Sequence, residues 1–245
     1  MYPMNHLNLS TKGLNCLDTI STLYNEFFGR RDYEWWYKVQ PGDIVVDIGA
    51  CIGLFTRHAL DNGAKKVYAI EPNSELLQTT LTNAFPYIVN RVESPVVPIN
   101  CAIGDPNNFN DYVGNVFFVK DRSTIPMRTF KQILEEYSID HIDYLKIDAE
   151  GAEFNVLIEE NIEFIKNNVK HIAVEVHLDA SPRAPESFIN FRDNFLSHFS
   201  EDKVKYLLND SKAKTYDDKY IKSKWPIGWG SCWMIYICNK SLPSQ

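Results

Sequence analysis

Residues 44–56, Ile-Val-Val-Asp-Ile-Gly-Ala-Cys-Ile-Gly-Leu-Phe-Thr, form the stretch that decides the fold. The apolar, largely β-branched run over 44–48 predicts a buried strand. Glycines follow at positions 49 and 53, where the backbone can turn tightly and approach a ligand without a clash from a Cβ atom. A helical pattern comes next. A strand, a glycine-bearing loop and a helix in this order predict a nucleoside site at the carboxyl end of the strand.

Working outward, short apolar runs alternate with helical patterns along the chain. This alternation predicts a mostly parallel sheet with helices on both faces, which is a doubly wound α/β fold. Thr129 and Gln132 have the spacing of a capping box and predict the start of one helix. The apolar stripes over 154–165 and 188–195 predict two more. The predicted parallel strands are residues 44–48, 66–70, 96–100, 144–147 and 171–176.

The two ends of the chain follow a different pattern. The strand-like runs 203–208 and 232–238 have no helical pattern between them and predict an antiparallel pair at one edge of the sheet, where the dinucleotide-binding fold would add another helical crossover. We expect a helical segment over 1–40 that packs over the mouth of the sheet, and one α/β domain over 41–245. The apolar residues of the first segment include Leu23, Phe27, Phe28, Trp35 and Trp36.

Several residues at strand ends suit a nucleoside without phosphate. The loop has Gly-x-x-x-Gly spacing, so it lacks the pyrophosphate fingerprint, and no Gly-Lys-Ser/Thr follows for a triphosphate. Glu71 ends the second predicted strand 22 residues after Gly49, where its carboxylate can accept hydrogen bonds from both ribose hydroxyls. The third strand runs into residues 100–105, which suit an adenine. The expected cofactor-binding residues are Asp47, Gly49, Ala50, Gly53, Glu71, Asn73, Ala102 and Asp148.

Five strings resemble, in order and spacing, those of FkbM-type methyltransferases. The resemblance spans residues 42–177, and its most distinctive string is Lys-Ile-Asp-Ala-Glu-Gly-Ala-Glu at 146–153. It implies a Rossmann-like class I methyltransferase sheet and S-adenosylmethionine as the cofactor, with S-adenosylhomocysteine as its product. It also implies O-methylation of a hydroxyl on a sugar, a glycan or a small natural product. The strings occupy residues 45–56, 69–73, 100–105, 144–153 and 174–177.

The sequence departs from the family pattern in two places. Residues 129–131 read Thr-Phe-Lys where the family usually has Thr-Leu-Asp, so any role of that aspartate is absent. Cys51-Ile52 stands in the glycine loop where Asn-Ile or a similar pair is usual. We expect the backbone turn to survive this second change.

The expected catalytic residues gather at the carboxyl ends of the fourth and fifth strands, where open α/β proteins bind ligands. His177 follows Glu175 with period-two spacing, so both side chains can emerge on one side of the strand. Asp148 and Glu150 lie at the corner after the fourth strand. Two interpretations stay open: His177 or Asp148 is a general base in a cluster oriented by carboxylates, or a divalent metal is bound. The metal ligands would be Asp148, Glu175 and His177.

Simpler roles exist for some of these residues. Glu150 and Glu153 stand at the opening of a helix, where carboxylates are favoured by unpaired amides. Lys146 inside an apolar strand needs a partner, and one of these two carboxylates is the simplest candidate. Trp35 and Trp36 suit the wall of an acceptor pocket, although aromatic packing onto the sheet is the simpler interpretation.

Composition restricts the partners. A net charge of −7 over 245 residues disfavours nucleic acid, because phosphate binding needs a basic face. The lysine-rich stretch 212–224 is interleaved with aspartates and indicates a solvated loop. Five cysteines without Cys-x-x-Cys spacing indicate reduced thiols. Without a signal-peptide pattern or an apolar run of roughly 18 residues, we expect no membrane span and a cytoplasmic protein.

Three alternatives remain from the sequence alone. The same fold serves nucleic-acid and protein methyltransferases, since fold and cofactor do not determine the acceptor. A non-catalytic subunit that binds an adenosine cofactor is the second alternative, and a nucleotide-linked oxidoreductase is the third. The acceptor, oligomeric state and metal dependence are not indicated by any motif.

Overall fold

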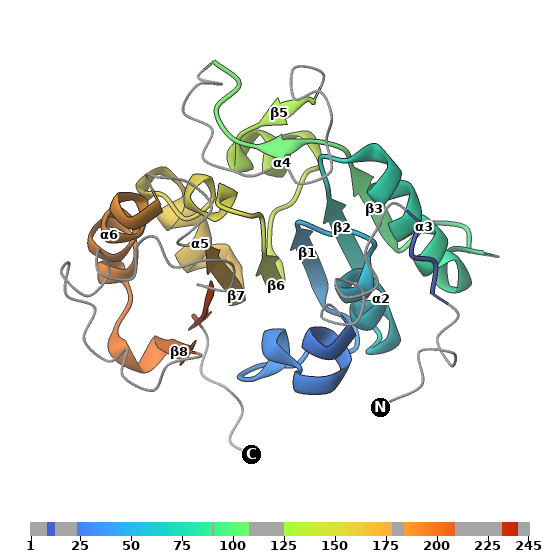
Figure 1. Ribbon diagram of the computed structural model, residues 1–245, viewed down its shortest axis with the longest axis horizontal. Helices are drawn as coiled ribbons and strands as arrows, with labels where there is room; N and C mark the ends of the chain where they lie inside the picture. The colour runs from blue at the N-terminus through green and yellow to red at the C-terminus, as the bar shows by residue number, and fades with distance from the viewer. Residues whose placement is uncertain are drawn as a thin grey trace. The chain divides into compact units, whose positions relative to one another are not determined.

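The computed structural model describes residues 9–12, 24–89, 91–107, 125–177, 184–208 and 232–239 (Figure 1). These residues form two compact units. Unit 1 contains the described residues up to Ala102 together with 125–126, and unit 2 contains those from Ile103 to 107 and from Met127 onward. The predicted lysine-rich loop over 212–224 lies outside the described residues, and the predicted domain boundary at residue 40 stays a prediction.

Unit 1 is built on three parallel strands in the order β3-β2-β1. β1 (Ile44–Ile48) and β2 (Lys66–Ile70) have the predicted bounds, and β3 (Val96–Ile99) ends one residue earlier than predicted. The connections are helices, α2 (Leu54–Asp61) and α3 (Ser74–Ile88), which contact one another. The carboxyl ends of β1 and β2 therefore both lead into helices at one edge of this sheet.

The amino-terminal part of unit 1 is only partly as predicted. It contains the π-helical turn η2 (Asn25–Arg30) and the 3₁₀ turn η3 (Asp32–Glu34). The Phe27 and Tyr33 rings stack at 5.0 Å, and both lie near the ring of Phe55 in α2. Trp35 is 53% exposed, which does not fit the simpler interpretation that it packs onto the sheet. Leu23 and the side chain of Phe28 lie outside the described residues.

Unit 2 contains the second part of the predicted sheet. β6 (Ile142–Ile147) and β7 (Val169–His177) pair in parallel, and β9 (Cys232–Cys238) pairs antiparallel with β7. β8 (Val204–Leu208) pairs antiparallel with β9 and so runs in the same direction as β7. The sheet of the chain is thus mostly parallel with an antiparallel carboxyl-terminal pair, which confirms the predicted fold class. A two-stranded sheet pairs β4 (Ala102–Ile103) with β5 (Met127–Arg128).

The helical predictions in unit 2 have mixed outcomes. α4 (Phe130–Glu136) begins with the predicted capping box between Thr129 and Gln132. α6 (Ala184–Asn194) buries Phe188 and Phe191 as predicted. The single helix predicted over 154–165 is wrong. Instead, the chain forms three short elements, η6 (Ala152–Asn155), η7 (Glu159–Asn161) and α5 (Ile162–Asn168), and two short 3₁₀ turns, η8 (Leu196–His198) and η9 (Glu201–Lys203), follow α6.

Two further predictions concern thiols and membranes. Cys51, Cys101 and Cys238 are free thiols, and the last two are buried, as expected for reduced core residues. Within the described ranges, no helix combines the length and the apolar character that crossing a bilayer requires.

Candidate functional site

The loop after β1 is held in a left-handed conformation that explains its glycines. Gly49, Cys51 and Gly53 have φ angles of 76°, 52° and 78°. The amides of Gly49 and Ala50 both donate to the carbonyl of Ile70, which ties the loop to the end of β2. Cys51 keeps the left-handed backbone, so the predicted turn survives the departure from the family pattern. The loop is therefore a rigid backbone cradle at the carboxyl end of β1.

Gly53 is required for a second reason, because the loop packs tightly against α3. A Cβ atom at this position would lie 2.6 Å from Cγ2 and 2.8 Å from the backbone Cα of Thr80. We expect Gly53→Ala to lower the free energy of unfolding by about 2–5 kcal/mol, which combines left-handed strain with overpacking. Urea denaturation measures this change.

Gly42 provides the matched control for this prediction. Its φ is 94°, but nothing lies within 4 Å of a Cβ atom placed there. Gly42→Ala should cost only the backbone strain, about 1–2 kcal/mol. Equal losses in the two variants would contradict the proposed contact between the loop and α3.

Glu71 reaches from the end of β2 to the glycine loop. Its Oε2 accepts a hydrogen bond from the Cys51 amide at 3.0 Å, and its Oε1 accepts one from the Asn73 amide at 2.9 Å. The residue is 7% exposed, so the carboxylate does not point into solvent. A carboxylate has about four lone-pair sites, so hydrogen bonds from backbone amides do not by themselves prevent it from accepting bonds from ligand hydroxyls. This geometry fits a ribose.

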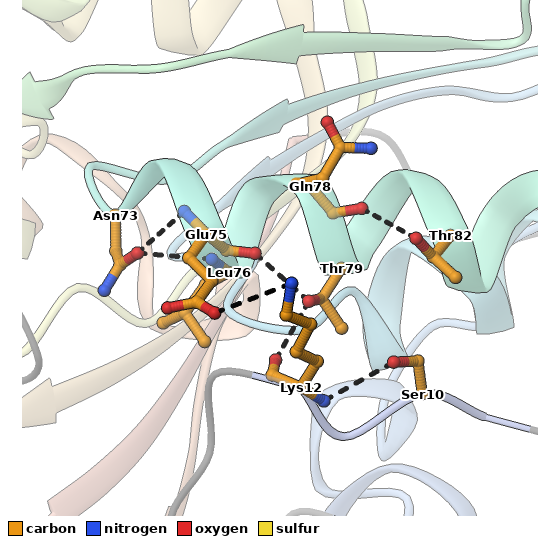
Figure 2. A network of polar contacts seen from close by, with 8 residues as sticks. All are labelled: Ser10, Lys12, Asn73, Glu75, Leu76, Gln78, Thr79 and Thr82. Atoms are coloured by element: carbon orange, nitrogen blue, oxygen red, sulfur yellow. Dashed lines mark hydrogen bonds and ion pairs between the residues drawn. The ribbon is translucent and has the colours of Figure 1, made fainter.

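The start of α3 does not fit a phosphate. Asn73 is the N-cap, and its Oδ1 accepts hydrogen bonds from the amides of Glu75 and Leu76 (Figure 2). Helix N-termini bind phosphate through such amides, and here the side chain of Asn73 already occupies them. The negative charge of Glu71 beside them further disfavours an anion. The residues present therefore fit a nucleoside without phosphate.

Three other residues at or beside the strand ends belong to unit 1. Asp47 is fully buried and accepts a hydrogen bond from the Thr56 hydroxyl at 2.7 Å, which fixes the start of α2 below the loop. Ala102 is buried in β4. Sequence reasoning placed Asn100 in the string 100–105 that suits an adenine but missed its contacts, in which Nδ2 donates to the carbonyls of Glu71 and Pro72 at 2.9 Å. Its place in the third motif string was the available signal.

Unit 2 contains a histidine held by a buried carboxylate. Glu153 is fully buried, and its Oε1 accepts the backbone amide of His177 at 2.6 Å and lies 3.3 Å from the Nδ1 of the same residue. Its Oε2 accepts the amide of Gly151 at 2.8 Å. A carboxylate beside Nδ1 favours the tautomer that carries its proton there, which leaves Nε2 with its lone pair. Sequence reasoning had given Glu153 only a capping role or that of a partner for Lys146.

Further acidic residues lie on the Nε2 side of His177. Nε2 is 3.8 Å from Asp148 Oδ1 and 3.7 Å from Glu150 Oε2. Lys146, which is 1% exposed, lies with its Nζ 3.7 Å from Asp148 Oδ2, so a carboxylate does face the buried lysine, but it is Asp148 where the sequence favoured Glu150 or Glu153. The structure thus brings together Asp148, Glu150 and His177 from the expected catalytic set.

Glu150 has an unusual backbone and an unusual acidity. Its φ of 52° turns the chain sharply after β6, and Gly151 follows at 104°. Loss of hydration is the largest cause that raises the pKa of Glu150 to about 7; a positive charge on His177 opposes it and neighbouring carboxylates, including Glu175, add to it. Near neutral pH this carboxyl can therefore both donate and accept hydrogen bonds, although 44% of its side chain is exposed.

The same three residues have the donor atoms of a metal site. One oxygen each of Asp148 and Glu150 and a ring nitrogen of His177 lie within 4.8 Å of one another. Mixed carboxylate and imidazole ligands suit Zn²⁺ or Mn²⁺. The sequence predicted Glu175 as the third ligand, but this group contains Glu150 instead. Glu175 lies two residues before His177 on β7.

Comparisons with known proteins bear on both units. Residues 47–203 match the model of the methyltransferase FkbM domain, which is more than half of the chain. A curated relative, the ribosomal protein arginine N-methyltransferase rmt3 of Schizosaccharomyces pombe (strain 972 / ATCC 24843), is 27% identical over 40% of this chain and 21% of its own length. This chain thus matches about a fifth of that relative.

The solved structure of a methyltransferase shares the fold, and others are more distantly similar. The crystal structure of methyltransferase FkbM from Methylobacillus flagellatus KT has a TM-score of 0.53 and 16% identity, and the match covers 87% of this chain and 47% of that one. A putative rRNA methylase from Clostridium thermocellum has a TM-score of 0.45 and 13% identity, with 92% and 96% covered. Since the family model matches most of the chain, and a family structure shares its fold, this protein belongs to the FkbM family of S-adenosylmethionine-dependent methyltransferases.

Proposed function

We propose that this protein methylates a hydroxyl group on a sugar, a glycan or a small natural product. S-adenosylmethionine supplies an activated methyl group, so the chain must chiefly bind it, align an acceptor and receive the acceptor's proton. Glu71 and the loop at 49–53 would hold the ribose and the tail of the cofactor. The remaining expected cofactor contacts, Asp47, Asn73, Ala102 and Asp148, are part of the same proposal.

The pairing of His177 with Glu153 is the observation that carries the choice of a hydroxyl acceptor. A neutral alcohol must lose its proton as the new bond to carbon forms, and a base with a pKa near neutrality is suited to that step. With Glu153 beside Nδ1, the neutral form of His177 would carry its proton there, and its Nε2 atom, on the side of Asp148 and Glu150, would be the acceptor. In our proposal His177 takes the hydroxyl proton.

The carboxylates beside His177 suit a polyhydroxylated acceptor. Asp148 and Glu150 offer acceptor oxygens, and a Glu150 carboxyl that is partly protonated also offers a donor. Sugars present both donors and acceptors on neighbouring carbons, so such a pair can orient one hydroxyl by binding the next. We assign Asp148, Glu150 and Glu175 this orienting role.

An arginine side chain is the second candidate acceptor. The cluster around His177 is rich in carboxylates, which bind guanidinium groups through paired hydrogen bonds. The curated relative is named as an arginine N-methyltransferase of a ribosomal protein. A guanidinium acceptor would use the charge of Asp148 and Glu150 and would depend less on His177.

One assay separates these possibilities. Purified protein is incubated with methyl-labelled S-adenosylmethionine and, in separate reactions, glycans, small alcohols, arginine-rich peptides and RNA. We expect label in a glycan or alcohol and its loss in Asp148→Asn. Label only in the peptides would support the second candidate, and label in RNA would contradict both.

Parallel reactions with EDTA, and with added Mn²⁺ or Zn²⁺, test the metal interpretation. Activity that survives EDTA would support His177 as the base. Activity that is lost and is restored by one ion would support a metal site at Asp148, Glu150 and His177 instead. No turnover on any acceptor, together with tight binding of S-adenosylhomocysteine, would favour the non-catalytic subunit.

A further inference from the structure

The amino-terminal residues 9–12, which we name the strap, lie along α3 (Figure 2). The Ser10 amide donates to Asn83 Oδ1 at 2.6 Å, and Asn83 Nδ2 donates back to the Ser10 carbonyl at 2.9 Å. The Thr79 hydroxyl donates to the Lys12 carbonyl at 2.9 Å. The strap is therefore bound through its backbone, by polar side chains on one side of α3.

Asn83 also binds the glycine loop. Its Nδ2 donates to the carbonyl of Ile52 at 2.7 Å, although 31 residues separate the two. Ile52 lies between Cys51, whose amide binds Glu71, and Gly53, which packs on Thr80. The side chain of Asn83 is thus a bridge between the strap and the loop.

The bridge leaves the amide little freedom. Asn83 is 2% exposed, and both donor positions and the acceptor oxygen of its side chain are used by Ser10 and Ile52. The backbone N–H of Ser10 donates to Oδ1 of Asn83 and so fixes the orientation of the Asn83 side-chain amide. Without it, the Nδ2 donor that holds Ile52 would lose its orientation, and a buried carbonyl would be left without its partner, which is costly.

We propose that Asn83 is a positioning residue for the cofactor loop and that docking of the strap sets the affinity of the loop for the cofactor. The inference rests on the proposed function, because it assumes that residues 49–53 bind S-adenosylmethionine. Asn83 acts through the Ile52 carbonyl, which keeps the Cys51 amide, and with it the Glu71 carboxylate, in the geometry that fits a ribose.

The test measures the Kd of S-adenosylhomocysteine by calorimetry, well below the melting temperature of each full-length variant. Asn83→Ala should raise the Kd about ten-fold, which corresponds to about 1.4 kcal/mol. Ser10→Pro removes the backbone donor of the strap together with the Ser10 hydroxyl, which binds the Lys12 amide, and should raise the Kd by about three- to ten-fold. In the double variant the two effects should not add, because both break the same bridge.

Two controls accompany these variants. Ser10→Ala keeps the backbone amide, and Thr82→Ala removes an exposed hydroxyl from the same helix (Figure 2). Both should bind the ligand within about two-fold of the wild type. If Asn83→Ala does not fold, the comparison of Ser10→Pro with Ser10→Ala still decides the matter.

The outcomes separate this inference from the function on which it rests. Wild-type protein that binds S-adenosylhomocysteine, with an equal Kd in Ser10→Pro and Ser10→Ala, would overturn the inference alone. Additive effects in the double variant would contradict the claim that Ser10 and Asn83 act on the loop through one bridge. Wild-type protein that does not bind the ligand would overturn the proposed function and the inference together.

Discussion

Replacing Glu71 with alanine is expected to raise the Kd of S-adenosylhomocysteine about 100-fold, equivalent to about 2.7 kcal/mol. The variant loses the carboxylate that would accept the ribose hydroxyls. It also leaves the amides of Cys51 and Asn73 without the oxygens that they bind in the present structure. Charge-assisted hydrogen bonds are the strongest of these contacts, so this one side chain should dominate cofactor affinity. Isothermal titration calorimetry measures the change.

Glu75→Gln is the control for this experiment. Glu75 also carries a negative charge near the start of α3, but its side chain is 58% exposed and pairs only loosely with Lys12 at 3.9 Å. Its replacement should leave the Kd within about two-fold, because exposed ion pairs contribute little. A Glu71→Ala variant that folds and binds as tightly as Glu75→Gln would remove the basis for a ribose at this loop.

His177→Ala is expected to lower kcat by about 10²–10⁴-fold on the true acceptor, which is the usual contribution of a positioned general base. The Kd of S-adenosylhomocysteine should stay within about two-fold, because in our proposal this side chain acts on the acceptor. Turnover is measured as the rate at which S-adenosylhomocysteine is released at saturating cofactor.

Glu153→Gln tests whether Glu153 orients His177 for catalysis. A glutamine keeps the size of the buried side chain but can present an amide donor to Nδ1, which would reverse the preferred tautomer of His177. We expect a loss of kcat between that of His177→Ala and the wild type. His141→Ala, at an exposed position, is the control and should retain full turnover. Full activity in both His177→Ala and Asp148→Asn would show that the catalytic assignment is wrong.

The strands were predictable because each is a mostly apolar run between turn residues. β1 and β2 have the predicted bounds, since burial on both faces leaves them almost wholly apolar, with Asp47 near the end of β1 and Glu71 directly after β2. The capping box at Thr129 was predictable because both of its hydrogen bonds are local. The edge pair β8 and β9 followed from the absence of a helical pattern between them.

The remaining errors come from interactions between residues that are far apart in the sequence. The stripe over 154–165 has helical periodicity, but Glu150 and Gly151 turn the backbone into positive φ. The Glu153 carboxylate is then used by His177, 24 residues away, and the segment breaks into short turns. No local pattern reports this pairing. Asn83, 31 residues from Ile52, escaped notice for the same reason.

The order of strands in unit 2 has a consequence for biosynthesis. β9 lies between β7 and β8, so in the described sheet β8 forms its strand pairing with β9. On the ribosome β8 emerges first, with no adjacent strand to which it can hydrogen-bond. Until residues 232–238 are released, both β7 and β8 present unpaired edges that other nascent chains can join. A chain that terminates before this point would be a candidate for chaperone capture and degradation.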